Sequence, residues 1–172
     1  MPLMSPHNVS DIRERRRSVR DVKIFIAEET ICDMLNHAEK GALNDSEVTG
    51  LLAGEVYRDD DGIYAVVSRT VDSGLLSDGA AGFSLSDTGI PFDELDRQDF
   101  NHIIVGWYRS HLGTGCLMSD TDVNTHSSVF GSETGFAVVI DPVKEELRVF
   151  ESSQDGPRET SMIIIEDYTH MA

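Results

Sequence analysis

The sequence predicts an α/β domain in which one mixed β-sheet lies between helices. Strand-like and helix-like segments follow one another in the order β-α-β-β-(α)-β-α-β-β-β, which is typical of such layered folds. The length of 172 residues fits one domain, and a 40% share of hydrophobic residues suffices for a core. The chain contains no internal repeat, so we expect one sheet with its helices.

The first half of the chain supplies three strands and one or two helices. Apolar runs rich in β-branched residues predict strands over residues 22–26, 47–57 and 63–71. An Asp-rich turn that ends at Gly62 joins the last two of these strands as a hairpin. Residues 28–42 predict a helix because their apolar positions recur at helical spacing. The stretch 72–90 is rich in Ser, Gly and Asp and predicts a loop, and a proline can start a helix over 91–98.

The second half begins with a continuous apolar run at residues 102–108, as expected for a strand at the centre of a sheet. A polar, Gly-containing loop then covers residues 109–118. Ser119 or Asp120 is suited to cap a helix that runs to about residue 128. The remaining apolar runs predict a hairpin and a last strand, at residues 136–140, 146–150 and 162–165.

The charge of the chain is strongly negative and unevenly distributed. Lys and Arg number 14 against 31 Asp and Glu, a net charge of −17. Residues 1–23 carry six basic and three acidic side chains, whereas the remaining 149 residues carry eight and 28. Such a body repels phosphate backbones, so we expect no nucleic-acid partner. Three Lys against 18 Asp suit either a cytoplasm of very high salt, as in halophilic archaea, or an acidic mesophilic surface.

We expect a basic N-terminal tail, residues 1–20, followed by a single domain, residues 21–172. The tail is either a flexible or fraying helical extension or a basic arm that docks on an acidic surface. The chain lacks a secretory signal and any stretch of roughly 20 apolar residues, so we expect a cytoplasmic protein without a membrane partner. Two cysteines are too few for a disulfide framework.

The residues that carry chemistry lie in the segment VGWYRSHLGTGCLMSDTDVNT, residues 105–125. His111 is followed after seven residues by Ser119 and then, after two more, by Asp122. Upstream, Glu47 opens the strand expected at residues 47–57 and is followed by Gly50 and two leucines. These residues resemble the active-site pattern of the JAMM (MPN-plus) metalloproteases, which is His-x-His, seven residues, Ser, two residues, Asp. Within this family, the segment most resembles the deubiquitinating subunits of the proteasome lid and the COP9 signalosome.

The resemblance implies an MPN fold, with an architecture like that of cytidine deaminases, and a zinc isopeptidase site. A catalytic Zn²⁺ takes three protein ligands and keeps one position for a water, whose pKa it lowers to about 7. By resemblance, His111 and Asp122 would be ligands and Glu47 the general acid/base. The hydroxyl of Ser119 would donate a hydrogen bond to the developing oxyanion.

The sequence departs from the family pattern at Arg109, which stands where the first ligand histidine belongs. A guanidinium has only donors and stays protonated, so it cannot ligate a cation. Two unit charges about 4 Å apart repel by roughly 4 kcal/mol at an effective dielectric near 20, and zinc is divalent. Arg109 could instead pair with Asp122 and Glu47. We therefore expect no catalytic zinc, with Glu47 and Ser119 idle.

Two neighbouring residues leave alternatives open. His126 lies four residues after Asp122 and is either a substitute metal ligand or an exposed helix histidine. Without zinc, Ser119 acts chiefly as the N-cap of its helix. Cys116 stands where the lid and signalosome relatives also carry a cysteine, so we do not count it as a new ligand.

Three functions are compatible with this sequence. The first is a catalytically inactive MPN protein that works through a protein partner, such as another MPN subunit, a ubiquitin-like protein or a second copy of the chain. It predicts an exposed apolar helix face, for which Ile31, Met34 and Leu35 are candidates. The second is an active zinc isopeptidase acting on ubiquitin or an archaeal ubiquitin-like modifier. In the third, Arg109 binds a carboxylate in the old cleft.

Overall fold

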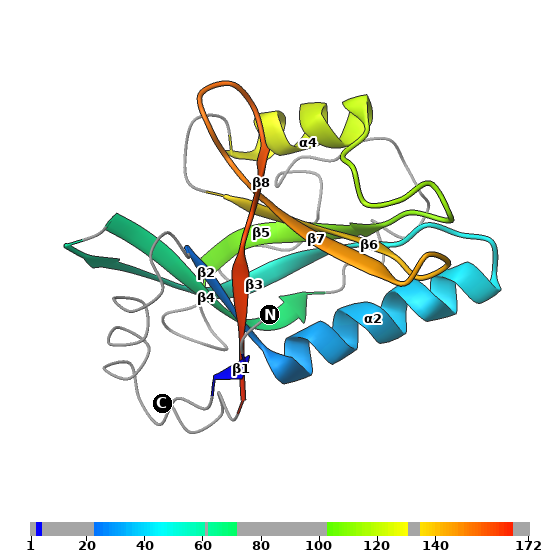
Figure 1. Ribbon diagram of the computed structural model, residues 1–172, viewed down its shortest axis with the longest axis horizontal. Helices are drawn as coiled ribbons and strands as arrows, with labels where there is room; N and C mark the ends of the chain where they lie inside the picture. Colours follow the sequence, from blue (N-terminus) through cyan, green and yellow to red (C-terminus); the bar gives the residue numbers. More distant parts are fainter. Residues whose placement is uncertain (1–2, 5–22, 61, 72–102, 131–134, 167–172) are drawn as a thin grey trace.

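The computed structural model describes residues 3–4, 23–60, 62–71, 103–130 and 135–166. These residues form one mixed sheet with a helix on each face (Figure 1). The strand order is β1-β9-β2-β4-β3-β5-β6-β7-β8. The elements are β1 (Leu3–Met4), β2 (Ile24–Ala27), α2 (Glu28–Leu43), β3 (Thr49–Asp59), β4 (Gly62–Val71), β5 (Ile103–Ser110), α4 (Asp120–Phe130), β6 (Phe136–Asp141), β7 (Glu146–Glu151), β8 (Arg158–Thr160) and β9 (Met162–Ile165).

The predicted strands and the two helices at 28–42 and 119–128 are confirmed to within a few residues. Three differences remain. β5 continues to Ser110, because Arg109 pairs with Thr49 on one side and Val139 on the other, so Arg109 belongs to a strand and not to a loop. The short strands β8 and β1 were not predicted. The loop expected at 72–90 and the helix expected at 91–98 lie outside the described residues, as does most of the expected tail.

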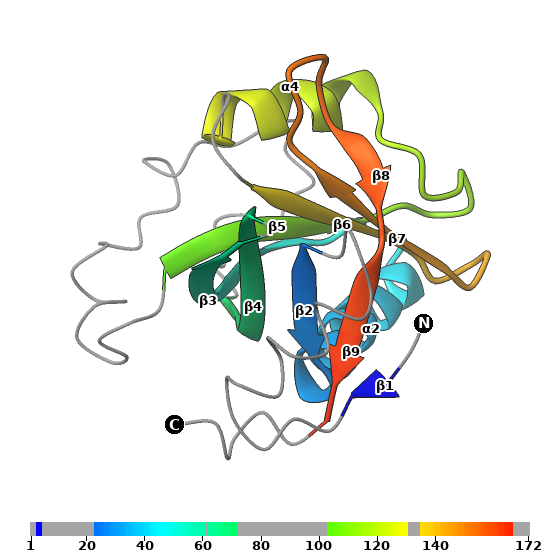
Figure 2. The ribbon, with the colours of Figure 1, turned by 60° about the vertical axis from the view of Figure 1, so that its left-hand side comes forward.

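The sheet curls until one segment joins its two ends (Figure 2). β8 and β9 follow one another with only Ser161 between them, yet β8 pairs with β7 while β9 pairs with β2 and β1. In β1, Leu3 and Met4 pair with Ile164 and Ile165. The same chain segment therefore holds together strands that stand far apart in the strand order.

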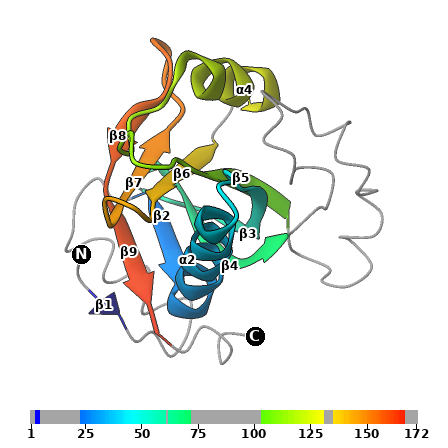
Figure 3. The same cartoon turned by 90° about the vertical axis from the view of Figure 1, so that its right-hand side faces the viewer.

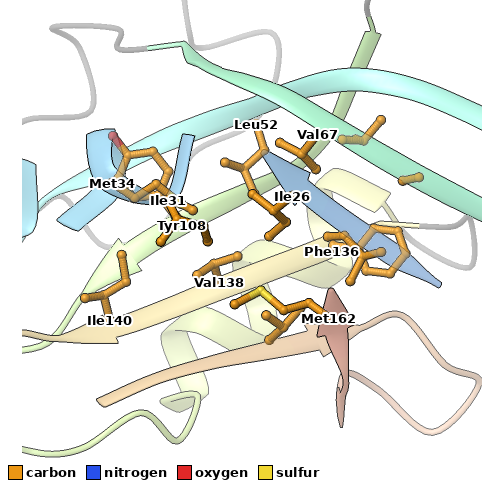
Figure 4. Packing of buried hydrophobic residues seen from close by; sticks show 14 of the residues in the cluster. Ile26, Ile31, Met34, Leu52, Val67, Tyr108, Phe136, Val138, Ile140 and Met162 are labelled. Atoms are coloured by element: carbon orange, nitrogen blue, oxygen red, sulfur yellow. The ribbon is translucent and has the colours of Figure 1, made fainter. Parts of the chain in front are cut away.

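Helix α2 covers one face of the sheet with its apolar side. Ile31 and Met34 are buried against strand residues such as Ile26, Leu52 and Val138, and Leu35 packs against this cluster (Figure 4). The expectation that Ile31, Met34 and Leu35 form an exposed partner surface is therefore wrong. The apolar side chains on this face of the sheet are shielded from water by the apolar side of α2, which is therefore not available to a partner.

Helix α4 lies on the opposite face of the sheet (Figures 1 and 3). The cluster on this side includes Trp107, Val139 and Phe130, while Tyr108 belongs to the cluster under α2. Because side chains alternate along a strand, Trp107 and Arg109 both face α4. This alternation brings Arg109 to the helix that carries Asp122. In the part of the chain that the structure describes, neither helix is long and apolar enough to cross a membrane.

Candidate functional site

Arg109 and Asp122 form a buried ion pair between β5 and the first turn of α4. The distance from Nη1 of Arg109 to Oδ1 of Asp122 is 3.1 Å, and the two residues are 7% and 0% exposed. Nη2 of Arg109 lies 3.6 Å from Oε2 of Glu47, whose side chain remains 36% exposed. The structure thus contains both ion pairs that the sequence suggested for Arg109.

His111 approaches the same carboxylate from the other side. Its Nε2 lies 2.9 Å from Oδ2 of Asp122, and its Nδ1 lies 2.8 Å from the carbonyl oxygen of Gly115. Both partners are acceptors, so the ring satisfies both bonds only when each nitrogen carries a proton. The hydrogen bond to Asp122 accordingly raises the pKa of His111, against the opposing effect of burial.

The environment of Asp122 keeps its carboxylate ionised. Burial alone would raise its pKa, but the hydrogen bonds from His111 and Ser119, together with the charge of Arg109, outweigh burial and lower the pKa. With His111 protonated, two cations face the two carboxylates of Asp122 and Glu47. The cluster is then formally neutral without any bound ion.

Ser119 caps the helix that presents Asp122. Its hydroxyl oxygen accepts a hydrogen bond from the N–H of Asp122 at 3.1 Å, and its own N–H donates to Oδ2 of Asp122 at 2.9 Å. This reciprocal pair is a capping box with Asp at the third helical position. The N-cap prediction for Ser119 is confirmed, and its role as an oxyanion donor stays a prediction.

Ser110 and Tyr108, which the sequence did not single out, position the strand that follows Glu47. Ser110 donates its N–H to the carbonyl of Val48 at 2.9 Å and accepts the N–H of Val48 on its hydroxyl at 2.7 Å. A Cβ on Gly50 would lie 2.3 Å from Cε1 of Tyr108, so only glycine leaves room for that ring. The alternation of Ser110 with Arg109 and His111 was the available signal that its side chain faces away from them.

His126 is a buried histidine, so the expectation of an exposed helix position is wrong. It is 1% exposed; its Nδ1 accepts the indole N–H of Trp107 at 3.1 Å, and its Nε2 lies 2.7 Å from the hydroxyl of Ser152. Burial lowers its pKa to about 4. Both ring nitrogens are engaged away from the His111–Asp122 pair, so the structure does not bring His126 there as a ligand. The four-residue spacing to the buried Phe130 could have signalled its inward position.

The residues present do not fit the zinc ion that the family pattern implies. Both oxygens of Asp122 are taken, one by a guanidinium that cannot coordinate a cation. Across the described residues, no three His, Cys, Asp or Glu side chains gather closely enough to hold a metal ion. Cys116 belongs to no such group among the described residues, and burial raises the pKa of its thiol to about 11.

Comparison with known proteins defines the class of this chain. The profile described as "JAB1/Mov34/MPN/PAD-1 ubiquitin protease" matches residues 18–132, which is more than half of the chain. The chain therefore belongs to the JAB1/Mov34/MPN/PAD-1 family, and its fold is the α/β MPN fold.

Two of three similar proteins are named as subunits of larger complexes. The 26S proteasome non-ATPase regulatory subunit 14 of Drosophila melanogaster is 32% identical over 128 residues, which cover 71% of this chain and 39% of that protein. The ubiquitin carboxyl-terminal hydrolase RPN11 of Saccharomyces cerevisiae is 32% identical over 127 residues, or 70% and 39% of the two chains. COP9 signalosome complex subunit 5 of Debaryomyces hansenii is 31% identical over 127 residues, or 72% and 26%. The chain thus spans about two fifths or less of these relatives.

A solved structure supports the fold alone. The solution structure of protein DSY2949 from Desulfitobacterium hafniense superposes with a TM-score of 0.62 at 23% sequence identity. The match covers 87% of this chain and 99% of that one.

Proposed function

We propose that this chain is a catalytically inactive member of its family that works as a protein-interaction subunit. The observation that carries the proposal is the 3.1 Å ion pair between Arg109 and Asp122. Because the carboxylate of Asp122 already neutralises the guanidinium of Arg109, this ion pair must break before Asp122 can hold a metal ion. Breaking it would leave the buried charge of Arg109 with only the 3.6 Å contact to the partly exposed Glu47, at a cost of up to roughly 3–5 kcal/mol.

The charge balance of the cluster supports the same proposal. In a zinc site, the ion brings two positive charges to the carboxylates around it. Here the guanidinium of Arg109 and the imidazolium of His111 supply two positive charges beside Asp122 and Glu47. A further divalent cation would face two like charges in a buried site, where charges are poorly screened.

The partner we propose is a protein, either another MPN-domain subunit, a ubiquitin-like protein or a second copy of the chain. Support comes from the relatives, whose names place them in the 26S proteasome and the COP9 signalosome. Since Ile31 and Met34 are used inside the fold, the docking surface we expect lies elsewhere than on this side of α2. The net charge of −17 favours a partner with a basic surface.

The second candidate is an active zinc isopeptidase acting on ubiquitin or a ubiquitin-like conjugate. It is favoured by the family and by the proximity of Glu47, His111 and Asp122, which resemblance assigns to the acid/base and ligand roles. In this candidate, the Arg109 side chain would have to leave Asp122 so that His111 and Asp122 could hold the ion, and water or a rearranged side chain would have to supply the missing ligand.

Zinc content separates the two candidates. We expect purified wild-type chain to hold zinc well below one equivalent by elemental analysis, and Arg109→His to gain zinc because it restores a neutral ligand and removes the cation. Arg148→His is the matched control: its Arg lies in an exposed ion pair with Glu159, and we expect it to stay zinc-poor. One zinc per wild-type chain would overturn the proposal.

An activity assay on an isopeptide-linked ubiquitin substrate completes the test. We expect no cleavage by the wild type. Cleavage by the wild type, or loss of bound metal in His126→Ala alone, would establish the second candidate instead.

A further inference from the structure

Asp141 is a fully buried acidic residue beside the site, and none of the roles described above uses it. It ends β6, is 0% exposed, and stands beside the loop that joins His111 to Ser119. We propose that Asp141 is the positioning residue of this cluster: it holds the loop in shape and thereby aims His111 at Asp122. The inference goes beyond the proposed function, because it holds for this chain whether or not a metal binds.

The contacts of Asp141 reach across the chain. Its two oxygens accept the N–H of Gly113 at 3.0 Å each, and Oδ2 accepts the N–H of Gly115 at 2.6 Å. Oδ1 also accepts the N–H groups of Val143 and Lys144 at 3.0 and 3.1 Å. Four main-chain amides therefore converge on one carboxylate, which is the arrangement of an anion-binding nest filled by the protein itself.

A local turn role accounts for only two of the four amides. The bonds to Val143 and Lys144 belong to the turn between β6 and β7, where an Asp often caps its own backbone. The bonds to Gly113 and Gly115 join residues 28 and 26 positions earlier in the chain. They fasten a different segment, and that segment is the one that follows His111.

The loop needs such a fastening. Gly113 and Gly115 both have φ of +89°, a conformation that other residues rarely adopt. Two such glycines in three residues leave the backbone many alternatives, and the carboxylate of Asp141 selects one of them. Burial would raise the pKa of Asp141, but the four amide bonds outweigh it and lower the pKa, so the acceptor stays ionised.

The selected loop conformation acts directly on His111. The carbonyl of Gly115 accepts the Nδ1–H of His111, and the main-chain N–H of His111 donates to Ile140 at 2.7 Å, one residue before Asp141. With Nδ1 committed to Gly115, Nε2 is the nitrogen that points at Asp122. A chain of contacts thus runs from Asp141 through Gly115 to the ring of His111.

The test is the exchange of the imidazole protons, followed by nuclear magnetic resonance at fixed pH. In Asp141→Asn, one oxygen becomes an NH₂ group that faces amide donors, so the loop loses its anchor. We expect exchange of the His111 Nδ1–H with water to become about tenfold faster or more, the effect of losing one such bond. The Nε2–H of His126, which faces Ser152, is the internal reference and should not change. The matched control is Asp120→Asn, an exposed carboxylate in the first turn of α4.

Three outcomes would overturn the proposal. One is a folded Asp141→Asn in which the His111 proton exchanges as in the wild type. Another is equal acceleration at His111 and His126, which would mean general loosening of the domain. The third needs no variant: in the wild type, we expect the amides of Gly113 and Gly115 to be protected from hydrogen exchange, and exchange at the rate of free loop amides would contradict the anchoring.

Discussion

Two buried histidines, one in this site and one beside it, have pKa values shifted in opposite directions. His111 and His126 are 6% and 1% exposed, and each ring makes a hydrogen bond from both nitrogens. The pKa of His111 is raised, whereas that of His126 is lowered to about 4. Similar burial of the same residue type therefore does not decide the charge.

The partners of each ring decide it. His111 faces a carboxylate and a carbonyl, both of which only accept, so the protonated ring fits. His126 accepts from the indole of Trp107 with one nitrogen and has the hydroxyl of Ser152 at the other, an arrangement that a neutral ring satisfies completely. The region around Asp122 is thus built from charges and the region around His126 from neutral groups, although both residues belong to α4.

The largest effect that this comparison predicts is on the charged region. Asp122→Ala leaves Arg109 buried without its 3.1 Å partner, so we expect the free energy of unfolding to fall by about 3–5 kcal/mol. Urea denaturation at pH 7 measures it. Asp120→Ala, two residues earlier and exposed, is the control and should change the free energy by less than about 1 kcal/mol. Equal losses in the two variants would contradict the idea that the ion pair is buried and coupled.

The neutral region predicts an effect on the acid side. Because the pKa of His126 falls from 6.5 in the unfolded chain to about 4 in the fold, only the unfolded chain binds this proton between those pH values. The free energy of unfolding should therefore decrease by about 3 kcal/mol as the pH falls from 6.5 towards 4. Asp122 loses its contribution to the free energy of unfolding only below its unfolded pKa of 3.8. The effects of His126 and Asp122 therefore fall in different pH ranges.

His126→Gln tests whether His126 causes this loss of stability at acid pH. The amide of glutamine does not titrate, and it can still accept a hydrogen bond from Trp107 and donate one to Ser152. Urea midpoints at pH 7 and pH 4.5 should converge in this variant relative to the wild type. If the free energy of unfolding of His126→Gln still fell between pH 6.5 and 4 as in the wild type, other groups would be responsible for the decrease.

The smallest expected effect lies on the alkaline side and belongs to His111. Its raised pKa means that its stabilisation is complete below pH 6.5 and is lost as the pH rises through the folded value. The loss is modest because Arg109 and the N–H of Ser119 still hold Asp122 when the imidazolium deprotonates. Thermal melts between pH 6.5 and 9 measure it, and His111→Gln should flatten the decline. A decline of the same size in His111→Gln would refute this assignment.

Much of the site was predictable from spacing. The segment from His111 to Asp122, together with Glu47, indicated the family. It also identified Asp122 and Glu47 as the carboxylates that could pair with Arg109. The sequence offered Ser119 or Asp120 as the N-cap, because short polar side chains of these types favour that position, and the structure selects Ser119. For the burial of His126, the spacing to Phe130 was the available signal, whereas the role we propose for Asp141 was not predictable in this way. Asp141 gave only a turn signal, because its partners at Gly113 and Gly115 are 28 and 26 residues away and become neighbours only when β5 and β6 pair.

The sequence by itself determined the alternation of strands and helices, the family and the fixed positive charge of Arg109. These follow from local periodicity and from the chemistry of single side chains, which no fold can alter. Only the tertiary structure decided which face of α2 is buried, that His126 is neutral and that His111 shares the carboxylate of Asp122. Those properties depend on the groups that the sheet brings together, and burial and hydrogen bonding set the energies of such groups only after they meet.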